Sequence, residues 1–280
     1  MMRKLKRLSI VQIIAAPIML VYIVISVYPL IWMAMSSIKP PWQFVGNSMA
    51  LPEMFFYENF INAWVRGQFN VYYINSVIIT VGGIAVILVL GSMAGFAIEK
   101  MRWRLSQVGL RIFLSGIMIP AIMLLLPQVL IYMRLGLFNN LTAVIAALAM
   151  GQLPISVYLF STFYRFFPNE VIESAVIDGC SIYQVFLRIV MPLTRNTVMT
   201  VIICSFFVFW NDFIAANTFT TRNDLKTIQV GVSLFVGNFT LTEWGPIFAG
   251  LTIATLPTVI LYLFLNKQVL TGVAEGSIKG

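Results

Sequence analysis

Few side chains in this sequence are suited to acid–base or nucleophilic chemistry. Its 280 residues include 18 lysines and arginines, 10 aspartates and glutamates, and no histidine. The absence of histidine excludes Ser-His-Asp and Cys-His nucleophiles and the usual zinc sites. Cys180 and Cys204 show no metal-binding or disulfide pattern, and no G-x-x-x-x-G-K-[ST] loop for phosphate is present. We therefore expect a chain that is not an enzyme and that binds neither a metal nor a cofactor of its own.

Asp212 is the one acidic residue in a long apolar run, residues 196–221. A charged side chain at the centre of a bilayer costs about 2.5–3.5 kcal/mol on insertion scales, so such residues usually face a helix bundle or water. Trp210 and Asn211 directly precede it. The group is therefore either a contact for a polar solute or a structural hydrogen-bonding site.

The elements that position these residues follow from long gaps between charges. Apolar residues make up 60% of the chain and charged residues only 10%, whereas a soluble domain carries about 25% charge. Each gap suffices for the roughly 20 helical residues that cross a bilayer. The sequence predicts an all-α integral membrane protein whose single transmembrane domain, residues 1–280, has six helices near 11–35, 71–97, 110–133, 141–163, 197–219 and 245–266.

The distribution of lysine and arginine predicts the orientation. With the N-terminus in the cytoplasm, 13 of the 18 basic residues lie inside and the other five outside, as the positive-inside rule requires. Both termini, with a tail at 267–280, are then cytoplasmic, and the loops 36–70 and 220–244 are outside. The first apolar run is about twice the length of a signal-peptide core, which favours an uncleaved helix. Because the basic residues border apolar runs, they favour the anionic membrane face over nucleic acid as a partner.

One cytoplasmic segment, residues 165–196, is too polar to be a span and predicts two short helices around a turn. Asn169 is a candidate N-cap of the first helix, with Glu170 and Glu173 in the first turn, where the helix dipole favours acids. One small and partly apolar face of this helix is expected from the spacing of Ile172, Ala175, Val176 and Gly179.

The second helix of this segment has its own start and stop signals. Gly179 permits the turn, Ser181 and Gln184 have the spacing of a capping box, and Pro192 interrupts the helix. Three interpretations fit such a pair: an interfacial pair lying on lipid, a DNA-reading helix-turn-helix, and a docking element for a cytoplasmic partner. The scarcity of basic residues disfavours DNA, and the other two remain open.

The same segment resembles a known motif. Glu173-Ser174-Ala175, then Gly179 after three residues, and Ile189 with Met191-Pro192 after nine more, match the EAA motif of permease subunits in binding-protein-dependent ABC importers. Ser174 and Met191 depart from the alanine and leucine of the motif but have similar bulk.

The resemblance extends over nearly the whole chain and is to the carbohydrate-importing branch, the maltose-type second permease. It rests on the order and spacing of short elements: Tyr28-Pro29-Leu30-Ile31-Trp32, Ser37-Ile38-Lys39-Pro40, Asn75-Ser76, Ala94-Gly95-Phe96-Ala97, Ile119-Pro120, Leu126-Pro127, Leu135-Gly136-Leu137, Trp210-Asn211-Asp212-Phe213 and Gly276-Ser277-Ile278-Lys279-Gly280.

This resemblance implies the type I importer permease fold and a set of site residues. Glu173, Ser174, Ala175, Asp178 and Gly179 would enter a cleft of the ATPase subunit, and Ile189 and Pro192 would anchor the second helix to the membrane domain. The tail Gly276, Ser277, Ile278, Lys279 and Gly280 would reach the ATPase interface. Independently of the resemblance, the ring of Trp210 and the hydrogen-bonding groups of Asn211 and Asp212 suit a sugar and form a candidate substrate path.

The resemblance also implies partners: a second homologous permease, two ATPase subunits that bind ATP and Mg²⁺, and an extracytoplasmic binding protein that delivers a carbohydrate. The location would be the bacterial cytoplasmic membrane, with lipid around the chain and no nucleic acid. The alternative, an ion-coupled secondary transporter, normally needs several intramembrane ionisable groups or inverted repeats. One acid and no visible repeat disfavour it.

Overall fold

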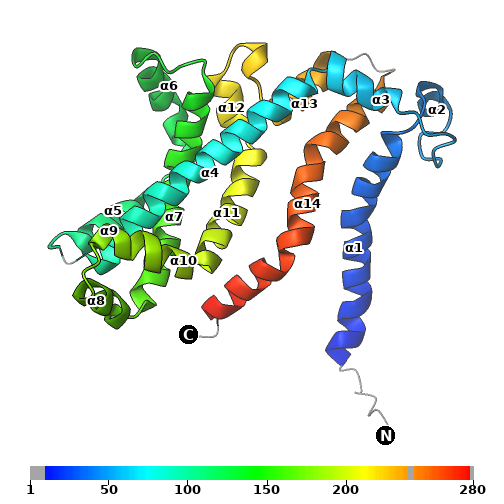
Figure 1. Cartoon of the computed structure of the whole chain (residues 1–280). Helices are drawn as coiled ribbons and strands as arrows, with labels where there is room; N and C mark the ends of the chain where they lie inside the picture. The colour runs from blue at the N-terminus through cyan, green and yellow to red at the C-terminus, as the bar shows by residue number, and fades with distance from the viewer. Residues whose placement is uncertain (1–9, 102, 239–242, 278–280) are drawn as a thin grey trace, which may run out of the picture. The chain divides into compact units, whose positions relative to one another are not determined.

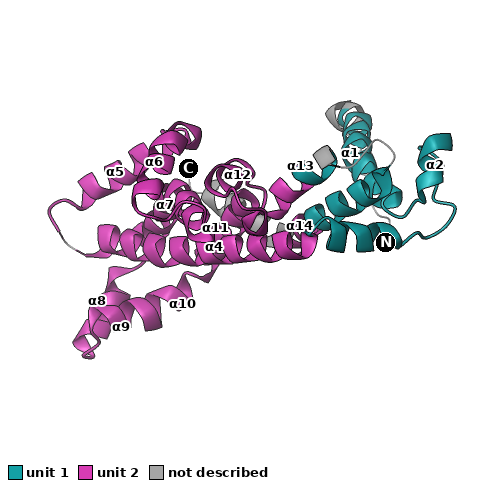
Figure 2. Ribbon diagram, turned by 90° about the horizontal axis from the view of Figure 1, so that it is seen from above, with its two compact units in different colours: residues 1–68, 234–255 teal, residues 69–233, 256–280 magenta. Residues whose placement is uncertain are grey.

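The computed structural model describes residues 10–101, 103–238 and 243–277, and every regular element in these ranges is a helix (Figure 1). Two compact units are formed, one by residues 1–68 and 234–255 and the other by residues 69–233 and 256–280 (Figure 2). The elements are α1 Ile10–Ser36, α2 Pro41–Gly46, α3 Glu58–Ile61, η1 Asn62–Arg66, α4 Phe69–Lys100, α5 Ser106–Ile117, η2 Ala121–Leu124, α6 Leu125–Arg134, α7 Leu141–Phe166, α8 Asn169–Ile177, α9 Ile182–Gln184, η3 Val185–Val190, α10 Met191–Leu193, α11 Arg195–Trp210, α12 Ile214–Phe219, η4 Asn223–Leu225, α13 Ile228–Asn238 and α14 Trp244–Ser277.

Four helices in the described part of the chain are long and apolar enough to span a membrane: α1, α4, α7 and α14. Two bent pairs raise the number to six if each pair counts as one span. The first joins α5 to η2 and α6 at an angle of 94°, and the second joins residues 182–193 to α11 at 74°. The composition therefore suits a protein that crosses the bilayer several times.

Two of the spans expected as single helices are interrupted. The stretch expected at 110–133 is split after Ile117, and Pro120 has an extended backbone with ψ of 125°. Proline has no N–H to donate and disfavours helical geometry in the residue before it, so the helix ends there. The stretch expected at 197–219 is split between Trp210 and Ile214. In contrast, α14 runs past the expected end at residue 266 to Ser277.

The second unit is organised around the close packing of α4 against α7. A Cβ atom built on Gly91 would lie 2.3 Å from the Ser156 hydroxyl oxygen, and one on Gly95 would lie 2.8 Å from Phe160 Cβ. The Ser156 hydroxyl donates to the Ile87 carbonyl at 3.1 Å. Only glycine permits two helix backbones to approach so closely, and the pair therefore forms a tightly packed core.

The segment before α13 is tied to α4 by polar contacts at Asn75 and Ser76. The Asn75 amide donates to the carbonyls of Asp224 and Lys226 at 2.8 and 2.9 Å. The Ser76 hydroxyl accepts a hydrogen bond from the Ile228 N–H at 2.9 Å. These buried side chains supply partners for loop backbone groups that would otherwise be unpaired.

Candidate coupling site

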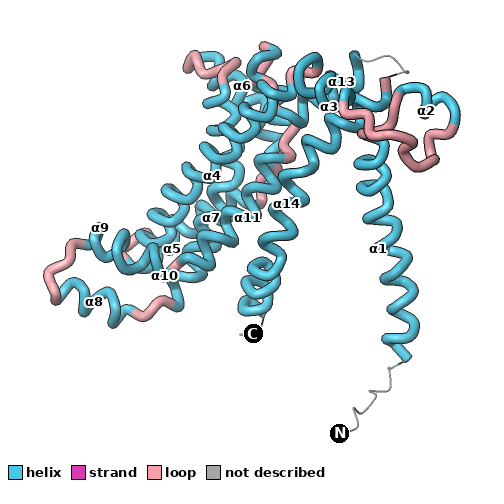
Figure 3. Tube along the Cα trace, turned by 45° about the vertical axis from the view of Figure 1, so that its right-hand side comes forward, coloured by secondary structure: helices cyan, strands magenta, loops and turns pink. Residues whose placement is uncertain are grey.

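The segment with the EAA-like residues forms a helical hairpin at one end of the second unit, built from α8, α9, η3 and α10 (Figure 3). It is fastened to the end of α4, where the Lys100 amine donates to the Phe167 carbonyl and to Asn169 Oδ1, each at 2.7 Å. The expectation that Asn169 caps α8 is wrong. The N-cap position is taken by Pro168, whose side chain has no hydrogen-bond acceptor, and Asn169 is the first residue of the helix. The Asn169 side chain accepts from Lys100 instead.

The turn after α8 is a Schellman motif. The Cys180 N–H donates to the Ala175 carbonyl and the Gly179 N–H to the Val176 carbonyl, both at 3.0 Å. Gly179 has a φ of +86°, and a Cβ atom there would meet no other atom within 4 Å. Glycine is therefore needed for its left-handed backbone, and the space around it is open.

The second helix of the hairpin begins with the capping box that the sequence predicts. The Ser181 hydroxyl accepts from the Gln184 N–H at 3.4 Å, and the Gln184 side chain accepts from the Ser181 N–H at 2.8 Å. The helix then widens into a π-helical stretch, η3, before Pro192 and the bend at Thr194. Both ends of the turn are thus fixed by local hydrogen bonds.

The inner face of the hairpin joins the main apolar core of the second unit. Ala175 is buried, and Ile172 and Ile189 are partly buried against the same cluster. Other buried members include Phe96, Phe160, Tyr164, Phe167, Val185 and Val190. The hairpin is therefore packed onto the core formed by α4 and α7.

The outer face carries most of the predicted coupling residues. Glu173, Ser174, Asp178 and Gly179 are exposed, as is Pro192. The face expected from helical spacing divides in two, because Ile172 and Ala175 turn inward while Val176 turns outward. Ile177, which follows Val176, is 84% exposed. The outer face of the hairpin thus exposes both acidic and apolar side chains, which a partner protein can contact.

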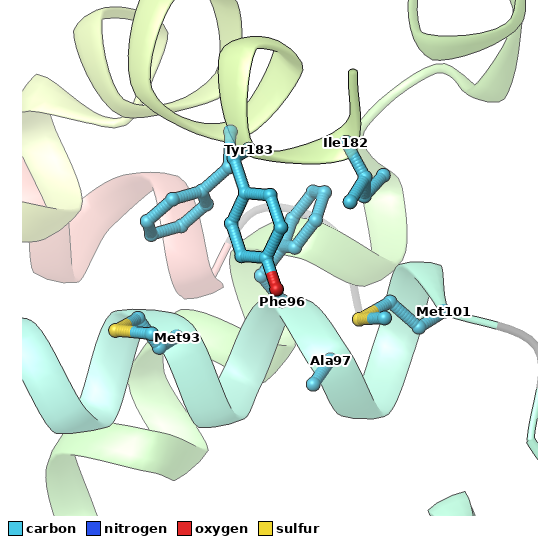
Figure 4. A pocket seen from close by; sticks show the side chains of 7 residues that line it. Met93, Phe96, Ala97, Met101, Ile182 and Tyr183 are labelled. Carbon is cyan, nitrogen blue, oxygen red and sulfur yellow. The ribbon is translucent and has the colours of Figure 1, made fainter.

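A small apolar cavity of about 210 Å³ lies between α4 and the second helix of the hairpin (Figure 4). Tyr183 and Ile182 face Met93, Ala97 and Met101 across it, as Figure 4 shows. Sequence reasoning missed Tyr183, whose ring is largely exposed. Its place two residues after the capping serine is the signal that assigns it to the first turn of α9.

The structure does not bring Trp210, Asn211 and Asp212 together in one site. Trp210 is buried, stacks on Phe206 at 5.7 Å between ring centroids, and lines a cavity beside α4. The Asn211 amide donates to the Phe207 carbonyl at 3.0 Å. Substrate contact by the three residues stays a prediction.

Asp212 lies in the break between α11 and α12, not inside a helix as the sequence suggested. Its carboxylate accepts from the N–H groups of Ala216 at 2.9 Å and Ala215 at 3.4 Å. It also lines a cavity of about 150 Å³ beside α6 and α7. The side chain therefore satisfies the first turn of α12, which explains how an acid is held in an apolar run.

The remaining predicted site residues are at the C-terminus. Gly276 and Ser277 form the last residues of α14, and Ile278, Lys279 and Gly280 lie outside the described residues. Among the side chains that the structure describes, no cluster of three or more His, Cys, Asp or Glu residues is suited to a metal ion.

Comparison with solved structures defines the class of fold. A crystal structure described as a bacterial ABC transporter involved in the import of the acidic polysaccharide alginate contains a chain that is similar with a TM-score of 0.79. The match covers 91% of this chain and 95% of that one at 19% identity. The chain thus shares the fold of one chain of a bacterial ABC transporter.

The chain belongs to the family of binding-protein-dependent transport system inner membrane components, whose family profile matches residues 87–273. It is 32% identical over 259 residues to the probable ABC transporter permease protein YurM of Bacillus subtilis, covering 92% of this chain and 86% of that protein. It is 24% identical over 267 residues to the diacetylchitobiose uptake system permease protein NgcG of Streptomyces coelicolor, covering 95% and 88%. The family resemblance in the sequence is therefore confirmed. The chain is a non-catalytic permease subunit, and ATP hydrolysis belongs to a separate subunit.

Proposed function

We propose that this chain is one permease subunit of an ATP-driven importer that carries a carbohydrate across the bacterial cytoplasmic membrane. An extracytoplasmic binding protein delivers the carbohydrate. Two observations support this substrate class: the diacetylchitobiose named for one relative and the alginate named for the structural neighbour. The carbohydrate-branch motifs of the sequence support it as well.

The observation that carries the proposal is the capped hairpin around Gly179. Its exposed residues Glu173, Ser174 and Asp178 adjoin an open glycine turn, while its inner face belongs to the core. A rigid element with a small residue at its tip suits insertion into a groove of an ATPase subunit, and its attachment to the core suits the transmission of movement. Two such ATPase subunits, which bind ATP and Mg²⁺, and a second permease subunit complete the transporter.

In this proposal the hairpin and both termini are cytoplasmic, and the tail 276–280 reaches the ATPase interface. The loops 36–70 and 220–244 are on the outer side and contact the binding protein. The distribution of basic residues supports this orientation.

The test is the substitution Gly179→Arg, with Gly136→Arg as its matched control. Gly136 also has a left-handed backbone, with φ of +69°, and equally open space, but it follows α6 outside the hairpin. Both variants carry a similar backbone strain, of about 1–2 kcal/mol. We expect only Gly179→Arg to lose co-purification with the ATPase subunits of the transporter, and to lose sugar uptake.

Normal ATPase binding and uptake by the folded Gly179→Arg protein would overturn the assignment of the hairpin. Equal loss of ATPase binding in both variants would attribute the effect to backbone strain instead.

A further inference from the structure

The segment between α1 and α3 has its polar side chains inside. Lys39 is fully buried, and its amine donates to the Ser48 carbonyl at 2.7 Å. Gln43 is also buried; its amide donates to the Leu51 carbonyl at 2.6 Å, and its oxygen accepts from the Glu53 N–H at 3.3 Å. Burial lowers the pKa of the Lys39 amine. The buried polar side chains therefore stabilise this loop by hydrogen bonds to its backbone.

The outer surface of the same segment is mostly apolar, although Asn47 and Glu53 are exposed as well. Val45 and Leu51 are 83% and 72% exposed. Glu53 is the only charged residue between positions 41 and 57. Other large apolar side chains exposed there are Trp42, Met49, Met54, Phe55 and Tyr57.

This arrangement is the reverse of the one that water favours. In water, apolar side chains are buried and lysine is almost never fully buried without a partner charge. In an apolar medium, backbone and polar groups must instead be satisfied internally, and apolar side chains face outward. This surface is therefore suited to apolar surroundings.

We propose that residues 41–57 lie in the outer interfacial region of the lipid bilayer, as a membrane-resting segment that continues from α1. The candidate span of α1 ends at Ser36, and Pro41 follows it by five residues. Trp42 and Tyr57 are of the types enriched where hydrocarbon meets headgroups. The partner is the lipid surface itself.

Within the loop 36–70, contact with the binding protein then falls to residues outside 41–57, because a soluble binding protein fits the surface of 41–57 less well than lipid does. A soluble binding protein binds only transiently. Whenever it dissociates, seven large apolar side chains would be exposed to water. The inference needs only that the chain is an integral membrane protein, so it does not depend on the carbohydrate. Since Lys39 is internal, no anionic lipid is needed, and phosphatidylcholine suffices.

The test uses the complete transporter in phosphatidylcholine nanodiscs, in a background with Cys180→Ala and Cys204→Ala. Nitroxide labels are attached to Val45→Cys and, separately, to Leu51→Cys. The matched control is Asn223→Cys, an exposed residue of η4 in the other outer loop. Collision rates are measured with oxygen, which concentrates in lipid, and with a water-soluble nickel chelate.

We expect the labels at positions 45 and 51 to collide more with oxygen and less with nickel than the label at 223, with or without the binding protein. Nickel accessibility equal to that of the control would overturn the proposal. Protection from both reagents would also overturn it, because it would show that protein covers the surface. Either result would leave the test of the hairpin unaffected.

Discussion

At the scale of single residues, Gly179 and Ala175 are required for different reasons, one for its backbone conformation and the other for the size of its side chain. Gly179 is required for its backbone angle and has open space around it. Ala175 is buried, so its small size is set by the core behind it. Its neighbour Ser174 is exposed and bonds only locally to the Val171 carbonyl. One short motif therefore combines a turn, a packing contact and a free surface.

Asp212 gives a prediction that separates a structural carboxylate from a substrate contact. We expect Asp212→Ala to destabilise the protein by about 1 kcal/mol, because two N–H groups at the start of α12 lose their acceptor. Asp212→Asn keeps one acceptor oxygen and should retain both stability and uptake. Thermal unfolding of the purified complex and sugar uptake measure the two effects. A stable Asp212→Asn protein without uptake would instead assign the charge to transport.

At the scale of elements, the hairpin is attached through Lys100. Lys100→Met removes the donors to the Phe167 carbonyl and Asn169, charge-assisted bonds worth about 1.5–3 kcal/mol. We expect amide hydrogen exchange across residues 167–181 to become about tenfold faster or more, since each 1.4 kcal/mol is a factor of ten.

Arg165→Gln is the control for this attachment. Arg165 pairs with Glu99 at 3.2 Å, with side chains 56% and 8% exposed. This pair joins α7 to α4 and includes no residue of the hairpin. Amide hydrogen exchange across residues 167–181 should therefore change little in the Arg165→Gln variant. If both variants behave alike, Lys100 is not the fastening point.

Local signals allowed correct prediction of some elements. The capping box of Ser181 and Gln184 and the turn at Gly179 depend on hydrogen bonds within a few residues, so the sequence contains the whole signal. The capture of Asn169 by Lys100 joins residues 69 positions apart. The burial of Lys39 likewise depends on how its loop folds, since lysine side chains are mostly exposed.

The proline residues likewise show that sequence alone does not predict whether a helix is continuous. Pro17, Pro29, Pro154 and Pro257 lie inside continuous helices, whereas Pro120 lies at a bend of 94°. Neighbouring helices can supply partners for the backbone groups that a proline frees, so sequence alone does not separate the two outcomes.

At the scale of the whole molecule, the sequence predicts one orientation. In a background with Cys180→Ala and Cys204→Ala, Asp178→Cys and Asn223→Cys place single thiols at exposed positions of the hairpin and of η4. We expect a membrane-impermeant maleimide added to intact cells, whose outer membrane has been opened where one is present, to label position 223 only. After full lysis it should label both. Labelling of position 178 in intact cells would reverse the proposed topology.

The glycine-mediated contact of α4 with α7 has a mechanical consequence. With 32 residues, α4 is about 48 Å long at 1.5 Å per residue. Gly91 and Gly95 allow α4 to pack closely against α7, so the two helices together resist bending and act as a stiff lever. A tilt of about 5° at one end would displace the Lys100 end, and the hairpin fastened to it, by roughly 4 Å, given that helix length. A small angular change at one membrane surface is thereby converted into a displacement of atomic size at the other.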